Sequence, residues 1–173
     1  MTEHLGQAVN PFDNYPGKGR DLADPFLRHT YRYQKMWENG SNSKHHYALY
    51  LILETKQPSC AYCEKILVDT FDHWLLTSID HVVPKNAIKS NDMREDWVHD
   101  LSNVVICCLA CNGYLNQYKL PTETRGPLSM EKWFALRDRT FREKREEAQA
   151  RLKTEREFFD ENLGSLPSSK KDL

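Results

Sequence analysis

The sequence predicts an α+β fold that is mainly helical, with a four-cysteine metal site at its centre. Two CxxC pairs, at 60–63 and 108–111, are spaced in the way that metal ligands are. The segment between them holds short stretches rich in β-branched residues, which are typical of strands. The segments on both sides show helix caps and helical periodicity, the longest of them at 129–164. A chain of 173 residues fits one compact domain of ordinary size.

The N-terminal part is predicted to be an irregular arm followed by two helices. Residues 1–23 combine asparagine, proline and glycine with little periodicity, which indicates the arm. Asp24 and Pro25 are a typical N-cap and first helical residue, so a helix is expected to begin there. Ser43 can cap a second helix, which Pro58 ends. The apolar face of this helix is expected to pack beneath the cysteine region and comprises Tyr47, Leu49, Tyr50, Ile52 and Leu53.

Two short segments between the cysteine pairs are predicted to be strands. They are TSIDHVV at 77–83 and NVVIC at 103–107, both rich in β-branched residues and bounded by turn formers. The polar segment NDMREDWVHD at 91–100 is predicted to form a helical turn between them. We therefore place one core over residues 24–128, with its metal-binding motif at 60–119.

The C-terminal part is predicted to be one long charged helix with a short tail. Ser129 can cap this helix and Gly164 can end it. Apolar residues recur along it as an interrupted stripe, which can face the core, a second copy of the chain or a partner protein. The polar tail at 165–173 is expected to be disordered.

Composition favours a globular protein outside the membrane. Charged residues make up 28% of the chain and the mean hydropathy is −0.73. No apolar run approaches the roughly 18 residues that span a bilayer, and no signal-peptide pattern is present, so we expect a soluble, cytoplasmic protein. The net charge of −1 does not indicate a nucleic-acid-binding domain. Any binding of nucleic acid must therefore come from local patches.

The cysteines are predicted to form a zinc site. Cys60 with Cys63, and Cys108 with Cys111, can converge on one ion because each CxxC turn holds two sulfurs together. The 44 residues between the pairs exceed those of a simple zinc ribbon, which predicts an insert. Structural Zn²⁺ is the expected ion, while a redox dithiol and incidental buried thiols are the alternatives. Cys107 is expected to face away from the metal, because neighbouring strand residues point to opposite sides of a sheet.

Asp80 and His81 are the residues between the cysteine pairs that suggest catalytic chemistry. They are adjacent on a predicted strand that ends at Pro84, so their side chains project to opposite faces and can divide two tasks. A carboxylate supplies a hard oxygen to a divalent cation, and a neutral imidazole can take a proton from water near pH 7. An Asp-His pair is a weak signal alone, and the second such pair, at 72–73, is interpreted as structural.

The joint order of these motifs resembles the HNH endonuclease family. The resemblance rests on CAYC at 60–63, IDHVVPK at 79–85 and NVVICCLACN at 103–112, and it covers about 60 residues. It implies a small ββα-metal core, also called a His-Me finger, with a four-cysteine zinc site. In this chain N-terminal helices and the long C-terminal helix would flank that core. The resemblance further implies metal-dependent hydrolysis of phosphodiester bonds in DNA.

The resemblance also implies a role for each matching residue. His81 corresponds to the general base, and Asp80 and Asn112 to the ligands of a catalytic divalent cation. Asn103 corresponds to the central asparagine, which braces the loop between the strands and helps to fix the histidine. Magnesium is the expected physiological ion, with Mn²⁺ or Ni²⁺ as substitutes. The chain departs from the family at Leu115, where many members have a lysine.

Contacts with DNA are expected from scattered basic residues, because no single basic patch stands out. The candidates are Lys85, Lys89, Lys119, Arg137 and Arg142. The main alternative to an enzyme is a zinc module without catalysis that binds nucleic acid or protein. A thiol redox protein is a third hypothesis. The presence of both Asp80 and His81 favours the enzyme, because a scaffold needs neither.

Overall fold

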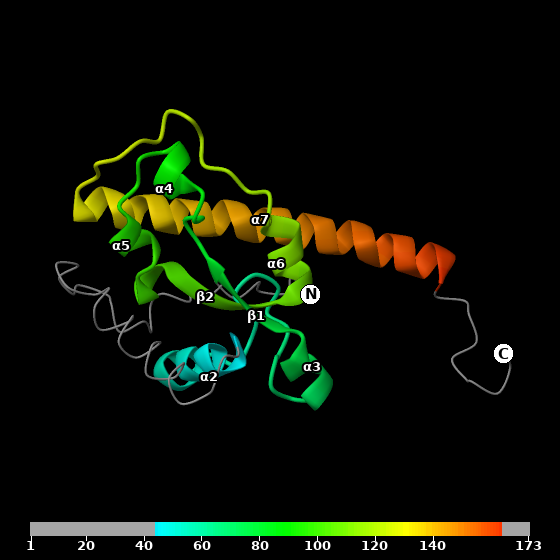
Figure 1. The fold of residues 1–173 in the computed structure, drawn as a ribbon. Coiled ribbons are helices and arrows are strands. Elements are labelled where there is room, and N and C mark those ends of the chain that lie inside the picture. Colours follow the sequence, from blue (N-terminus) through cyan, green and yellow to red (C-terminus); the bar gives the residue numbers. More distant parts are fainter. Residues whose placement is uncertain (1–43, 164–173) are drawn as a thin grey trace, which may run out of the picture.

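The computed structural model describes residues 44–163 (Figure 1). The predicted arm at 1–23, the helix expected from Asp24 and the tail at 165–173 lie outside the described residues. The described part is a mixed α/β fold with a two-stranded sheet, several helices and a long C-terminal helix. None of the helices between residues 44 and 163 has the length and apolar character needed to cross a membrane.

The sheet consists of the two predicted strands. β1 (Thr77–His81) and β2 (Val104–Cys108) pair antiparallel, with Asp80 opposite Val105. β2 is buried along its whole length, as expected for a run of valine, isoleucine and cysteine. β1 is buried at its start and half-buried toward His81. The polar end of β1 therefore lies at the edge of the core, where solvent can reach it.

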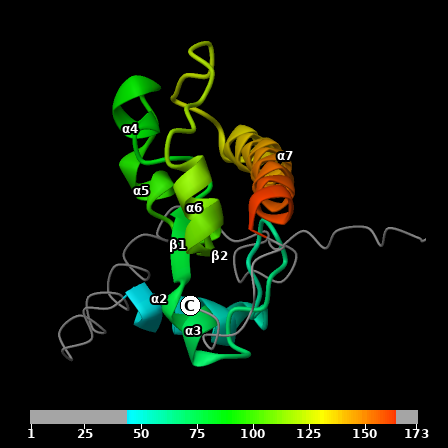
Figure 2. The same ribbon diagram turned by 90° about the vertical axis from the view of Figure 1, so that its right-hand side faces the viewer.

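Helices lie on opposite sides of this sheet. In both views α2 (Lys44–Thr55) and α3 (Phe71–Leu75) lie below the strands, and α7 (Met130–Asn162) lies above them (Figures 1 and 2). α6 (Leu109–Leu115) follows β2 directly and lies between the sheet and α7. One hydrophobic core joins α2, both strands, α6 and the middle of α7.

The core-facing side of α2 differs from the prediction. Ala48 and Leu51 are fully buried, whereas Leu49 and Leu53 are 45% and 58% exposed. Ile52 is partly buried against the core, and the side chains of Tyr47 and Tyr50 lie outside the described residues. The helix is apolar around much of its circumference, so its sequence did not determine which side would meet the sheet.

The insert between the strands forms a second small core. It contains α4 (Ala87–Ser90), α5 (Glu95–Val98) and a 3₁₀ turn at Leu101–Asn103. α5 confirms the helical turn predicted over 91–100. The apolar side chains of this insert pack on the first turns of α7, together with Leu120 from the segment after α6. The buried members are Val83, Ala87, Met93, Trp97, Val98, Leu120, Trp133 and Leu136.

The long C-terminal helix begins where the sequence predicts. Ser129 is its N-cap, and the Ser129 hydroxyl accepts a hydrogen bond from the Lys132 backbone N–H at 3.3 Å. α7 has 33 residues and is therefore about 50 Å long. Its first half is packed on the core, while residues 153–163 are all exposed and extend past the rest of the described chain (Figure 1).

Candidate functional site

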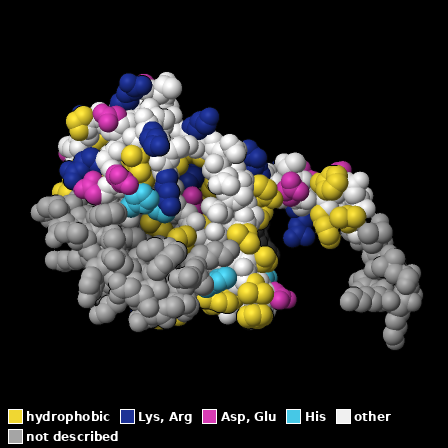
Figure 3. Space-filling model, viewed as in Figure 1, with side chains coloured by type: hydrophobic (Ala, Val, Ile, Leu, Met, Phe, Trp, Pro, Cys, Tyr) yellow, Lys and Arg dark blue, Asp and Glu magenta, His cyan; other side chains and the backbone are white. Residues whose placement is uncertain are grey.

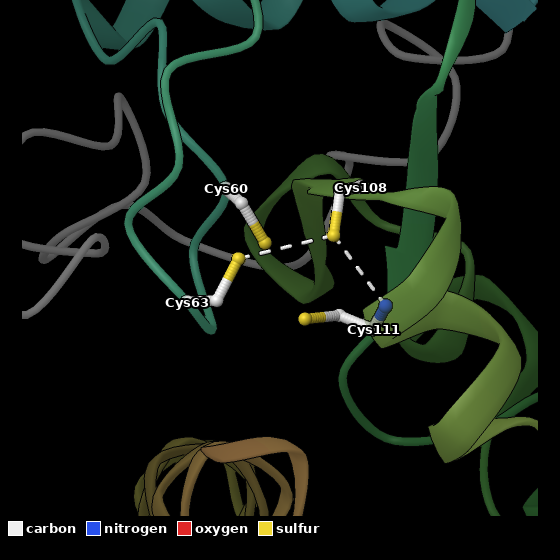
Figure 4. A group of neighbouring side chains, drawn as sticks. All are labelled: Cys60, Cys63, Cys108 and Cys111. Atoms are coloured by element: carbon white, nitrogen blue, oxygen red, sulfur yellow. Dashed lines mark hydrogen bonds between the residues drawn. The ribbon is translucent and has the colours of Figure 1, made fainter. Parts of the chain in front are cut away.

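The two CxxC pairs converge as the sequence predicts. The four sulfur atoms of Cys60, Cys63, Cys108 and Cys111 lie within 4.8 Å of one another (Figure 4). Four Zn–S bonds of 2.3 Å in a tetrahedron place sulfurs about 3.8 Å apart, and the Sγ atoms of Cys63 and Cys108 are separated by 3.8 Å. The donor set and its spacing fit Zn²⁺, so this cluster could hold a structural metal ion.

A tight turn forms the first half of the cluster. The Cys60 N–H donates to the Lys65 carbonyl at 2.8 Å, and the Glu64 N–H donates to the Cys60 carbonyl at 2.9 Å. Glu64 closes the turn with a φ of 63°, in the left-handed region. The Ala61 N–H donates to the Ile106 carbonyl at 3.0 Å, which fastens this turn to β2.

The second half of the cluster lies at the junction of β2 and α6. Cys108 ends the strand and is the N-cap of α6, where its sulfur accepts a hydrogen bond from the Cys111 N–H at 3.4 Å. Hydrogen bonds from the thiols of Cys111, Cys60 and Cys63 hold the pKa of Cys108 well below its usual range. The same cluster raises the pKa of Cys60 and Cys111, so Cys108 is the member most readily converted to the thiolate, which is the metal-binding form of cysteine.

Cys107 lies outside the cluster, as predicted. It is fully buried in the core, while the four clustered sulfurs come from its neighbours in sequence and from the first turn. Burial raises the pKa of the Cys107 thiol, which keeps it protonated. Cys107 therefore contributes as a small apolar side chain.

A separate pocket brings together three of the four predicted catalytic residues. Asp80, His81 and Asn112 line one hollow with a volume of about 380 Å³. β1 supplies the first two residues and α6 supplies the third. Lys85, Asn86, Asn116 and Lys144 line the same pocket. Residues that are up to 64 positions apart in the sequence therefore meet here.

Asp80 is held by two side chains that sequence analysis does not single out. Its Oδ2 accepts hydrogen bonds from the Tyr62 hydroxyl and from the Lys144 ammonium, the latter at 2.5 Å. Burial and the nearby charge of Asp80 raise the pKa of Tyr62, so its hydroxyl stays protonated and can donate. Tyr62 lies between the two cysteines of CAYC, and Lys144 lies on the same helix face as Phe141 and Ala148. These two positions in the sequence were the signals that could have identified Tyr62 and Lys144 as residues of the site.

Asn112 is oriented by a hydrogen bond to β1. Its Nδ2 donates to the Ser78 hydroxyl at 3.1 Å, which ties α6 to β1. Among the described residues, neither Asn112 Oδ1 nor Asp80 Oδ1 takes part in a hydrogen bond. Two hard oxygen donors are thus available, and they fit Mg²⁺ or Mn²⁺ by donor chemistry. The ammonium on the other carboxylate oxygen opposes such an ion electrostatically.

Asn103 lies behind the pocket and braces the loop that follows His81. It is fully buried, and its Nδ2 donates to the carbonyls of Val83 and Val98 at 2.9 and 2.8 Å. Its Oδ1 accepts from the Val83 N–H at 2.8 Å. These bonds are the loop bracing that the resemblance implies for Asn103. A part for Asn103 in catalysis stays a prediction.

A second histidine lies next to His81. The His81 and His99 rings are 5.3 Å apart, centroid to centroid, and meet edge to face. Burial and the charge of Lys85 lower the pKa of His99 from its usual value. His99 is therefore neutral at pH 7, and adds no positive charge beside His81.

The predicted basic contacts divide into exposed and buried residues. Lys85, Lys89, Lys119 and Arg142 are exposed. Arg137 is only 7% exposed, because its guanidinium donates to the Ser102 carbonyl at 3.0 Å and to the Asp138 carboxylate. The prediction that Arg137 contacts DNA is therefore wrong, because its guanidinium is buried and paired. Basic side chains are interspersed with acidic ones over the face shown in Figure 3.

The chain matches none of the family models, curated proteins or solved structures with which it was compared. No match therefore supplies a function for the cysteine cluster or for the pocket. What these two sites do must be inferred from their own geometry and chemistry.

Proposed function

We propose that this chain is a metal-dependent HNH endonuclease that hydrolyses phosphodiester bonds in DNA. One observation carries the proposal: Asp80, His81 and Asn112 line a single pocket next to a four-cysteine cluster. The strand, strand and helix that supply these residues follow one another as β1, β2 and α6. This order supports a ββα-metal core whose last zinc cysteine lies directly before the Asn112 that lines the pocket.

In the proposed mechanism, His81 accepts a proton from the water that attacks the phosphorus atom. The His81 ring lies at the accessible end of β1, and Asn103 fixes the loop that continues from it. A divalent cation on Asp80 and Asn112, with Mg²⁺ expected and Mn²⁺ or Ni²⁺ as substitutes, would stabilise the departing oxygen. Asn112 is held in place for this task by Ser78.

Binding of DNA is proposed to use exposed cations, one of which lies at the pocket. Lys85 lines the pocket, and Lys89, Lys119 and Arg142 are exposed elsewhere on the surface. With a net charge of −1, non-specific affinity for a polyanion is expected to be low. A second copy of the chain or a partner protein on α7 would supply the missing affinity.

The alternative is a zinc module without catalysis that binds nucleic acid or protein. One observation favours it: the Asp80 carboxylate already has a buried ammonium as its counter-ion. A module of this kind would keep its full function without His81 and would bind no divalent ion at Asp80.

A plasmid cleavage assay tests the proposal. Zinc-loaded protein is incubated with supercoiled plasmid and Mg²⁺ or Mn²⁺, and nicked and linear DNA are measured over time. We expect cleavage that His81→Ala reduces by about 100-fold or more, because the general base is lost. His73→Ala is the matched control, since His73 lies on α3, outside the pocket, and pairs with Asp69.

Three results would contradict the proposal or part of it. One is a wild-type protein that leaves the plasmid intact with every divalent ion tested. Another is cleavage that His81→Ala leaves unchanged, which would indicate a contaminating nuclease. Equal loss in both histidine variants, with unchanged folding by circular dichroism, would also remove His81 from the mechanism.

A further inference from the structure

Lys144 occupies a position that is unusual for a lysine. Its side chain is 1% exposed, although α7 is otherwise a highly charged helix. Lysine is almost never fully buried unless its charge is paired. Burial of this ammonium therefore points to a specific task at the pocket that it lines.

The ammonium of Lys144 is surrounded by oxygen atoms of β1 and the loop after it. Its Nζ lies 2.5 Å from Asp80 Oδ2, 3.1 Å from the His81 carbonyl and 3.3 Å from the Val82 carbonyl. Three oxygens match the three donors of an ammonium. The rings of Tyr62 and Tyr118 flank it, with centroids 5.9 and 5.7 Å from Nζ. The protein thus provides its own cation next to the candidate metal ligand.

We propose that Lys144 sets the affinity of the pocket for its divalent cation. The inference rests on the proposed function. Lys144 holds Asp80 through Oδ2, leaves Oδ1 to the ion, and keeps the affinity low because the two positive charges repel each other in a half-buried site. Lys144 is thus a positioning residue that makes cleavage depend on the concentration of free metal ion.

The sign of the expected effect separates this role from a structural one. Damage to the pocket would weaken metal binding, whereas removal of a competing charge strengthens it. The Tyr62 hydroxyl still donates to Asp80 Oδ2 when the ammonium is gone, so the carboxylate keeps one of its two restraints. Loss of Lys144 should therefore increase the affinity for the ion.

Binding of Mn²⁺ to the zinc-loaded full chain tests the proposal without any cleavage assay. Free Mn²⁺ is measured by electron paramagnetic resonance in a titration of wild type and Lys144→Met. We expect the variant to bind about tenfold more tightly or better. Asp80→Asn combined with Lys144→Met should abolish this binding. Lys153→Met is the matched control, because Lys153 is an exposed lysine on the same helix.

A second neutral variant guards against a failure to fold. Lys144→Gln keeps a hydrogen-bond donor for Asp80 without the charge, and it replaces Lys144→Met if circular dichroism shows the latter unfolded. The thermal midpoint of the neutral variant should also rise more with Mn²⁺ than that of wild type, because the ion then binds the folded state more tightly.

The outcomes distinguish this inference from the proposed function. Equal or weaker Mn²⁺ binding in the neutral variants overturns the role of Lys144, and leaves the endonuclease to be decided by the plasmid assay. Absence of Mn²⁺ binding at Asp80 in every variant overturns the role of Lys144 and the proposed metal site together. Tighter binding that survives Asp80→Asn overturns it as well, because the ion then binds elsewhere.

Discussion

Asn103 braces the loop that follows His81. Its amide makes three hydrogen bonds to backbone groups of Val83 and Val98, all of them buried. The Val82 backbone N–H also donates to the backbone carbonyl of Asn103, at 2.8 Å. The loop after β1 is thus held by the Asn103 side chain, by this backbone bond and by the Lys144 ammonium, which donates to the carbonyls of His81 and Val82.

Asn103→Ala is predicted to lower the free energy of unfolding by about 3 kcal/mol or more, because three buried backbone groups lose their partner. Urea unfolding of the zinc-loaded protein measures this change. Asn116→Ala is the matched control, since Asn116 is exposed and should change stability by less than about 0.5 kcal/mol. A cost for Asn103→Ala as small as that of the control would show that the loop is held by other contacts.

Some site residues could be predicted from the sequence and others could not. Asp80, His81 and Asn112 were expected to meet because the order of their motifs resembles that of the HNH endonuclease family, and they do line one pocket. Tyr62 and Lys144 have no such pattern, because burial of a tyrosine hydroxyl or a lysine ammonium is decided by which elements pack together. Arg137 was predicted to contact DNA for the same reason, although its guanidinium is buried against the Ser102 carbonyl.

The turn, strand end and helix start around the four cysteines form one unit. Cys108 is the N-cap of α6 and a member of the sulfur cluster, whereas Cys107, one position earlier, is buried in the core. A metal ion held there would join the turn at Cys60 to the start of α6. Because Tyr62 extends from that turn to Asp80, the same unit also positions the candidate active site.

Replacement of neighbouring cysteines separates the metal ligand from the core residue. Cys108→Ser is predicted to lose bound zinc and to destabilise the domain, because a structural zinc site contributes directly to folding. Cys107→Ser should keep one zinc ion per chain, with a moderate loss of stability. Zinc per chain is measured by atomic absorption after dialysis. Retention of zinc in Cys108→Ser together with its loss in Cys107→Ser would reverse the ligand assignment.

Predictability also varied between elements. Ser129 is the N-cap of α7 and the two strands lie where their β-branched residues predict them, because each has a strong local signal. The buried side of α2 was predicted less well, as Leu49 and Leu53 face outward. A helix with apolar residues on several sides takes its orientation from the partner it packs against.

The distribution of charge over the molecule limits how it can bind a polyanion. Exposed cations predicted to contact DNA are Lys85, Lys89, Lys119 and Arg142. Acidic side chains lie among the basic ones on the face shown in Figure 3. The overall charge of −1 provides no long-range attraction to a phosphate backbone.

Affinity for duplex DNA is predicted to depend only moderately on salt. A plot of log Kobs against log salt concentration should have a slope no steeper than about −4, because about four phosphates can be neutralised. Fluorescence anisotropy with a labelled duplex, without divalent ions, measures this slope. Lys85→Ala should make it shallower by roughly one, and Lys153→Ala should not change it. A slope twice as steep would indicate a basic surface outside these residues.

The separation of the two cysteine pairs has a consequence for the kinetics of folding. In the unfolded chain, 44 residues lie between Cys63 and Cys108, and bringing the pairs together costs about 3 kcal/mol of loop-closure entropy. A zinc ion that binds both pairs early closes this loop before β1 and β2 have to find each other. Refolding should therefore be faster in the presence of zinc than in the presence of a chelator. Without zinc, the apolar strands should stay exposed to solvent for longer, which favours aggregation.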